Sequence, residues 1–180
     1  MTPDPMRATG GALRLAYADP PYLGCGAKLY GRPEWDDPET HRSLIATLER
    51  DYPDGWAMSL SSTTLHTILP MCPDDVRVAA WCKSFASFKP NVNPAYTWEP
   101  VIWRGGRTKR SRTQDTVRDY HVEAITLRRG FAGAKPPGFA LWVVQLLGAD
   151  VRQGDTITDL FHGSGAMLGV WRQATQEVAV

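Results

Sequence analysis

An apolar run that ends in an acid and two prolines constrains this 180-residue chain more than any other feature. Residues 12–18 are ALRLAYA, which is typical of a buried strand, and Asp19-Pro20-Pro21-Tyr22 follows at once. Proline lacks a backbone N–H and fixes φ, so the strand has to end there in a stiff turn. The sequence therefore places a carboxylate and an aromatic ring at the carboxyl end of a buried strand.

Strand-like and helix-like segments alternate along the rest of the chain. Apolar runs predict further strands at 56–60, 76–81, 96–103 and 156–160. Helix-like segments lie between them, and this alternation favours an α/β fold with a largely parallel sheet. A chain of 180 residues with 43% hydrophobic residues is long enough for one domain with a well-formed core.

A second motif, Asp159-Leu160-Phe161-His162-Gly163-Ser164-Gly165, repeats the pattern of strand, acid and turn. A glycine turn between a strand and a helix lets a ligand approach the backbone closely. The motif is not a phosphate-binding loop, since no Gly-Lys-Ser/Thr follows, and its glycines lack the dinucleotide-binding spacing. Tight packing without a ligand is the alternative interpretation of the two glycines.

The first motif suits chemistry on an exocyclic amino group of a planar base. The Asp19 carboxylate and the Pro20 carbonyl, held still by Pro21, can each accept an N–H hydrogen bond from such an amine. Tyr22 can stack on a base that has been flipped out of its helix. A stiff strand-to-loop turn without a catalytic role is the alternative.

The two motifs and their order resemble the β class of amino-methylating DNA methyltransferases, which use S-adenosyl-L-methionine. In that family the Asp-Pro-Pro-Tyr motif comes first, followed by a target-recognition region, a Lys-Pro element and a Phe-x-Gly-x-Gly motif. This chain matches at 19–22, at Lys135-Pro136, and at Gly154-Asp155 with 159–165. Glu99 also lies where the family often has a glutamate on a strand.

The resemblance implies a circularly permuted, Rossmann-like methyltransferase fold of reduced size, with a mostly parallel twisted sheet flanked by helices. It implies one domain over 1–180, with a catalytic half at 1–103, a basic target-recognition loop at 104–130 and a cofactor-binding half at 131–180. The implied catalytic residues are Asp19, Pro20, Pro21 and Tyr22. The implied cofactor-binding residues are Lys135, Pro136, Asp159, Leu160, Phe161, His162, Gly163, Ser164 and Gly165.

The net charge of +1 excludes a generic polyanion binder, so local charge clusters have to carry any contact with nucleic acid. Two clusters are candidates for contacts with a phosphate backbone. Their members are Lys28, Arg32, Arg104, Arg107, Lys109, Arg110 and Arg112. Solvated surface loops are the alternative interpretation of both clusters.

The sequence predicts neither a disulfide framework nor a metal site. The three cysteines form no Cys-x-x-Cys pair, and the four histidines lack metal-ligand spacing. Reduced thiols, no signal-like N-terminus and no apolar stretch of membrane-spanning length predict a soluble, cytoplasmic protein. The resemblance implies a bacterial or phage-infected host cell.

We therefore expect methylation of an exocyclic amine in duplex or single-stranded DNA. Adenine N6 is favoured, because the aspartate that opens the first motif resembles the adenine enzymes. Methylation of cytosine N4, of RNA or of a protein amide stays open, as does a non-catalytic nucleic-acid-binding subunit. The acid that holds the cofactor ribose in the family has no good match before Val180, so we expect a cofactor pocket that is trimmed, or one that a second copy or a partner subunit completes. The small size suggests a solitary or phage-borne modification enzyme.

Overall fold

A six-stranded sheet forms the centre of the computed structural model, which describes residues 11–85, 90–108, 116–125 and 134–178. The strands are β1 (Arg14–Ala18), β2 (Gly55–Ser59), β3 (Arg77–Cys82), β4 (Trp98–Gly105), β5 (Tyr120–Val122) and β6 (Thr156–Asp159). Their order is β5-β3-β4-β2-β1-β6. β4 runs antiparallel to both of its neighbours, and every other pair is parallel. The predicted α/β fold with a mostly parallel sheet is confirmed.

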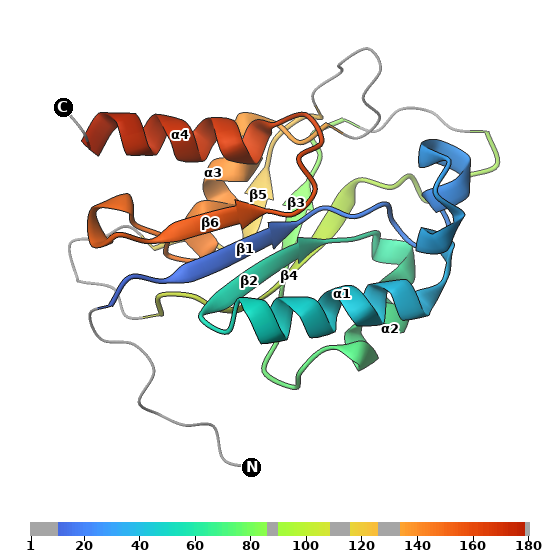
Figure 1. Cartoon of the computed structure of the whole chain (residues 1–180). Helices are drawn as coiled ribbons and strands as arrows, with labels where there is room; N and C mark the ends of the chain where they lie inside the picture. The colour runs from blue at the N-terminus through green and yellow to red at the C-terminus, as the bar shows by residue number, and fades with distance from the viewer. Residues whose placement is uncertain (1–10, 86–89, 109–115, 126–133, 179–180) are drawn as a thin grey trace.

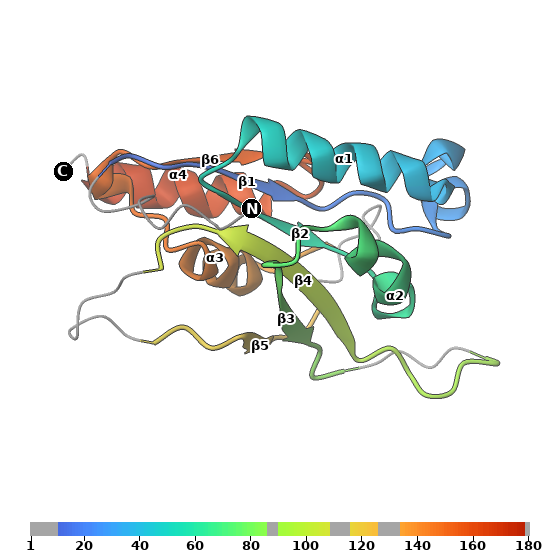
Figure 2. The ribbon, with the colours of Figure 1, turned by 90° about the horizontal axis from the view of Figure 1, so that it is seen from below.

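Helices cover both faces of this sheet. The α-helices are α1 (Pro38–Asp51), α2 (Leu65–Ile68), α3 (Pro137–Leu146) and α4 (Ala166–Val178). The short π and 3₁₀ segments are η1 (Gly26–Tyr30), η2 (Pro33–Asp36), η3 (Ser62–Thr64), η4 (Leu69–Met71) and η5 (Val151–Gln153). α1 and α2 lie on one face and α3 and α4 on the other (Figures 1 and 2). Within the described ranges, every helix is too short or too polar to serve as a membrane span.

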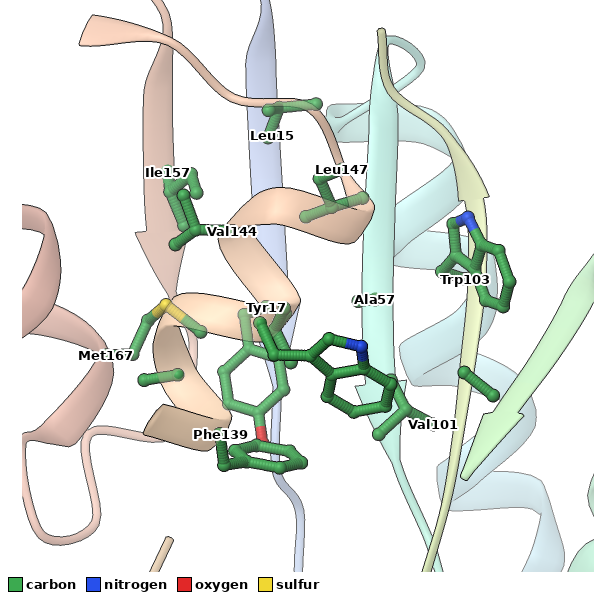
Figure 3. Packing of buried hydrophobic residues seen from close by; sticks show 14 of the residues in the cluster. Leu15, Tyr17, Ala57, Val101, Trp103, Phe139, Val144, Leu147, Ile157 and Met167 are labelled. Carbon is green, nitrogen blue, oxygen red and sulfur yellow. The ribbon is translucent and has the colours of Figure 1, made fainter. Parts of the chain in front are cut away.

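The buried side chains of β1 alternate between two cores, as expected for a strand with both faces covered. Leu15 and Tyr17 join the core beneath α3 and α4, whereas Ala16 and Ala18 join the core beneath α1 and α2. Figure 3 shows the first of these cores, where the rings of Tyr17 and Phe139 meet edge to face at 6.2 Å. β1 is therefore held from both sides, and its carboxyl end is fixed in place.

A buried ion pair between Arg107, which follows β4, and Asp155, which precedes β6, lies at the opposite end of the sheet. The Asp155 side chain is fully buried and lies 2.8 Å from the Arg107 guanidinium. Its oxygens also accept hydrogen bonds from the backbone N–H groups of Leu13 (2.7 Å) and Asp150 (2.8 Å). Asp155, which the resemblance included in the donor motif, thus lies at the end of β6 opposite to Asp159.

The predicted basic loop from Arg104 is wrong at its start, because Arg104 belongs to β4. Its guanidinium pairs with Glu49 (2.5 Å) and with Asp75 (2.6 Å). The Arg107 side chain is 15% exposed and pairs with Asp155. The acidic partners of these arginines come from distant elements, so the run of basic residues in the sequence does not reveal them. Lys109, Arg110 and Arg112 lie outside the described residues.

Replacing Asp155 with alanine should destabilise the fold strongly. The substitution leaves the Arg107 charge and two backbone N–H groups buried without their acceptor. Breaking a buried ion pair in this way costs about 3–5 kcal/mol, which urea unfolding would measure. The control is Asp51→Ala, which removes an exposed pair with Arg50 and should cost much less. Equal losses for the two variants would show that the Asp155 contacts do not stabilise the chain.

Candidate functional site

One cavity of about 780 Å³ lies at the edge of the sheet where β1 and β6 end. Both sequence motifs contribute to its wall, although about 140 residues separate them. The first motif supplies Asp19, Pro21 and Tyr22, and the second supplies Asp159, Phe161, His162, Gly163 and Ser164. The remaining lining residues are Tyr17, Leu29, Tyr30, Arg32, Glu99, Ala134, Lys135, Ala166 and Met167.

The topology explains why the cavity lies at this edge. β1 and β6 are adjacent and parallel, and Tyr17 pairs with Asp159. The chain leaves β1 toward α1 on one face of the sheet and leaves β6 toward α4 on the other (Figures 1 and 2). Such a switch point between neighbouring parallel strands opens a crevice outside their carboxyl ends, where α/β proteins commonly bind ligands.

Three predicted site residues from the second motif and its surroundings are not among the residues that line the cavity. Pro136 caps the N-terminus of α3, and Leu160 packs toward the core beneath α1. Gly165 has a φ of +79° and directly precedes α4, where its carbonyl accepts from Gly169 (2.9 Å). In the first motif, the Pro20 residue is buried and is not a lining residue, whereas Pro21 lines the cavity.

The glycine turn gives open access to its backbone. A Cβ atom at Gly163 would meet only the Phe161 carbonyl, at 3.6 Å, and one at Gly165 would meet nothing within 4 Å. The turn is anchored by Asp159, whose carboxylate accepts from the backbone N–H of Phe161 (3.2 Å). The turn therefore leaves room for a ligand against the main chain.

Four charged side chains meet around the Tyr22 phenol, and all of them except Lys83 line the cavity. The Lys135 ammonium lies 3.1 Å from Asp19 Oδ1 and 3.1 Å from Glu99 Oε2. It also donates to the Tyr22 hydroxyl (2.8 Å), which in turn donates to Glu99 (2.7 Å). Lys83 pairs with the other Glu99 oxygen at 2.5 Å. We call Asp19, Tyr22, Lys83, Glu99 and Lys135 the charged cluster.

Burial and neighbouring charges shift the pKa values of Glu99, Asp19 and Lys135. Burial alone would raise the pKa of Glu99, but Lys135 and Lys83 lower it to about 2. Burial raises the pKa of Asp19 even though Lys135 opposes that shift. Burial disfavours the charge on Lys135, yet Asp19 and Glu99 raise its pKa above the ordinary range. Glu99 and Lys135 are thus a buried ion pair at neutral pH.

One of the predicted nucleic-acid-binding residues, Arg32, lines the cavity and pairs with Glu34 at 2.8 Å. Lys28 is exposed on η1. Leu29 and Tyr30 lie between them in the sequence, line the cavity and are about half exposed, at 53% and 49%. We call these exposed lining residues the mouth of the cavity, which combines the Tyr30 ring with the Arg32 cation. Arg104 and Arg107 are held elsewhere in the ion pairs described above.

Sequence reasoning missed Tyr17 and Lys83 and did not commit to Glu99. Period two in a strand puts Tyr17 on the same side of the chain as Asp19, and this signal was available in the sequence. Glu99 and Lys83 reach the site because the start of β4 and the end of β3 lie at the same edge of the sheet as the end of β1. Their positions depend on strand order and direction, which the sequence pattern does not contain.

No group of three or more His, Cys, Asp or Glu side chains in the described part of the chain is arranged to hold a metal ion. The three cysteines, all described, are free thiols.

Solved structures share this fold, although the sequence matches no family model and no curated protein. M1.HpyAVI in complex with SAM superposes with a TM-score of 0.58 at 13% identity, over 91% of this chain and 80% of that one. TTHA0409 from Thermus thermophilus, assigned provisionally as a DNA modification methylase and complexed with S-adenosyl-L-methionine, gives 0.51 at 15% identity, over 94% and 79%. The predicted methyltransferase-type fold is thereby confirmed.

Glu99 should make stability depend on pH in the acid range. Its pKa falls from 4.5 to about 2 on folding, so the unfolded chain takes up the proton first on acidification. The stability that ionised Glu99 contributes is complete above pH 4.5 and is lost as the pH falls toward about 2. Glu99→Gln cannot ionise and should lose unfolding free energy less steeply than the wild type between about pH 5 and about pH 3.

Urea unfolding at a series of pH values would measure this slope. Glu39→Gln is the matched control, because Glu39 is exposed on α1 and pairs only with Arg42 among the described residues. It should keep the wild-type slope. A wild-type slope for Glu99→Gln as well would show that Glu99 is not held as an ion pair.

Proposed function

We propose that the protein transfers a methyl group from S-adenosyl-L-methionine to an exocyclic amino group of a DNA base, with adenine N6 as the favoured target. One observation carries the proposal: the Asp-Pro-Pro-Tyr turn and the Asp159 glycine turn line a single cavity at the switch point between β1 and β6. The shared fold with M1.HpyAVI, solved in complex with SAM, supports it.

The residues of the second motif fit this cofactor. S-adenosyl-L-methionine supplies an electrophilic methyl carbon on a positively charged sulfur when it is bound. Asp159 and Asp19 put carboxylates in the same cavity, which favours a cationic ligand. The open backbone at Gly163 gives room for close approach, and Phe161 offers an aromatic face.

The residues of the first motif fit the acceptor. The amine of a base is a weak nucleophile because its lone pair is delocalised into the ring. Asp19 and the Pro20 carbonyl would accept its two N–H hydrogen bonds and direct the lone pair toward the methyl carbon. Asp19 or water would accept the proton that the amine loses on methylation. Tyr22 would stack on the flipped base.

The mouth of the cavity fits a nucleic acid strand. Lys28 and Arg32 can contact phosphates, and Tyr30 between them offers a ring to a neighbouring base. The expected homodimer or partner subunit stays a prediction, which the mass of the purified chain in solution, with and without the cofactor, would test.

Methyl transfer from labelled S-adenosyl-L-methionine would test the proposal on duplex DNA, single-stranded DNA, RNA and a protein extract. Nucleoside analysis of the product should give N6-methyladenine. N4-methylcytosine would replace the adenine assignment, and label in RNA or protein alone would replace DNA as the substrate. Calorimetric titration without detectable cofactor binding would instead support a non-catalytic nucleic-acid-binding subunit.

Asp19→Asn should reduce the rate of transfer by at least about 100-fold, because an amide presents a donor as well as an acceptor to the amine. Cofactor affinity should change little, since the second motif is intact. Asp51→Asn is the matched control, an exposed aspartate of α1 that pairs with Arg50, and it should keep wild-type activity. Wild-type rates in the Asp19→Asn variant would refute the acceptor site.

A further inference from the structure

Side chains from separate elements of the fold surround Asp19, the residue proposed to accept a hydrogen bond from the amine. Lys135, just before α3, lies 3.1 Å from Asp19 Oδ1, and the Tyr22 hydroxyl oxygen, which donates its proton to Glu99, lies 3.3 Å from the same Asp19 oxygen. Glu99 at the start of β4 accepts from both Lys135 (3.1 Å) and Tyr22 (2.7 Å). The contacts hold one oxygen of Asp19 and thereby orient the other.

The members of the cluster are too buried to act as independent surface charges. The side chains of Lys135, Glu99 and Lys83 are 9%, 14% and 15% exposed, and that of Asp19 is 24% exposed. Two carboxylates face two ammonium groups, so the cluster is neutral when all four are ionised. Removing any one charge leaves another buried without its partner, which is strongly unfavourable.

Aromatic rings hold the Lys135 ammonium in place. It lies 5.2 Å from the centre of the Tyr22 ring, 5.5 Å from that of Trp81 and 5.8 Å from that of Phe139. A cation within about 6 Å of several ring faces gains electrostatic stabilisation where water is scarce. The geometry therefore fixes Lys135 against Asp19 even before a ligand binds.

We propose that Lys135 keeps Asp19 ionised and oriented for the acceptor amine, and that Glu99 and Lys83 are positioning residues that hold Lys135 there. The inference rests on the proposed function. It assigns Lys135 to the acceptor carboxylate, whereas the sequence resemblance placed it at the cofactor. When the amine N–H bond breaks, Asp19 takes the proton and passes it to water, which restores the neutral cluster.

The charges around Asp19 predict opposite effects of the two neutralising substitutions. Burial raises the pKa of Asp19, Lys135 lowers it and Glu99 raises it. The other titratable groups that interact with Asp19 are Tyr17, Tyr22, Tyr30 and Asp159. Removing the Lys135 charge should therefore raise the pKa of Asp19, and removing the Glu99 charge should lower it.

The test is the pH dependence of kcat/KM for the wild type, Lys135→Met and Glu99→Gln. Lys135→Met should lose at least about 100-fold in kcat, with its acid limb moved to higher pH. Glu99→Gln should lose about tenfold, with its acid limb moved to lower pH. Calorimetry should give cofactor affinities within about threefold of the wild type for both.

Matched controls separate these effects from general loss of charge. Arg42→Met and Glu39→Gln neutralise an exposed ion pair on α1 and should keep the wild-type rate and pH profile. Circular dichroism and urea unfolding would identify a variant that fails to fold. For such a variant, Lys135→Arg or Glu99→Asp takes its place, and each should recover part of the rate.

The inference would be overturned if weaker cofactor binding accounts for the whole loss of kcat/KM in Lys135→Met and the pH profile of this variant matches that of the wild type. It would make Lys135 a cofactor ligand while leaving the proposed function intact.

If the wild type transfers no methyl group, the proposed function fails, and carboxyl-carbon NMR titration tests the cluster directly. The Asp19 signal, assigned with Asp19→Asn, should then titrate at higher pH in Lys135→Met and at lower pH in Glu99→Gln. Unmoved titration would overturn the inference.

Discussion

The parallel pairing of β1 with β6 is the constraint on which the site depends. The pairing joins the first strand of the chain to the last, with Tyr17 opposite Asp159. Because side chains alternate along a strand, a slip of one residue would turn Asp159 away from the side that Tyr17 and Asp19 share. The Asp155 contacts to Leu13 and Arg107 at the other end of the same two strands oppose such a slip.

The strand ends that carry the motifs could be predicted from the sequence because their signals are local. An apolar run, a proline pair and a glycine turn each act on the backbone within a few residues. The predicted strand at 156–160 agrees with β6 to one residue at its end, and the run at 12–18 contains β1. The convergence of both motifs on one cavity also requires β1 and β6 to be neighbours in the sheet, and this strand order is not contained in the local patterns.

The charged cluster could not be predicted in the same way, because it depends on strand direction. β4 runs antiparallel to its neighbours, so its first residues rather than its last lie beside Asp19. A run of apolar residues has the same pattern in either direction, so the sequence did not determine at which edge of the sheet Glu99 lies. The ion pairs of Arg104 could not be predicted for a related reason. Strand pairing and packing bring Glu49 and Asp75 next to it from distant segments of the chain.

Lys135 connects the chemistry of the site to the packing of the domain. It lies two residues before α3, and Phe139 on the first turn of that helix is fully buried in the core beneath the sheet. The packing of α3 thus fixes the position of the Lys135 backbone relative to Asp19, so that the side chain can reach Asp19. In turn, the ion pairs with Asp19 and Glu99 tie the start of α3 to β1 and β4. A buried charge before α3 that needs partners at β1 and β4 is satisfied only when all three elements are in place, so the site forms together with the core around it.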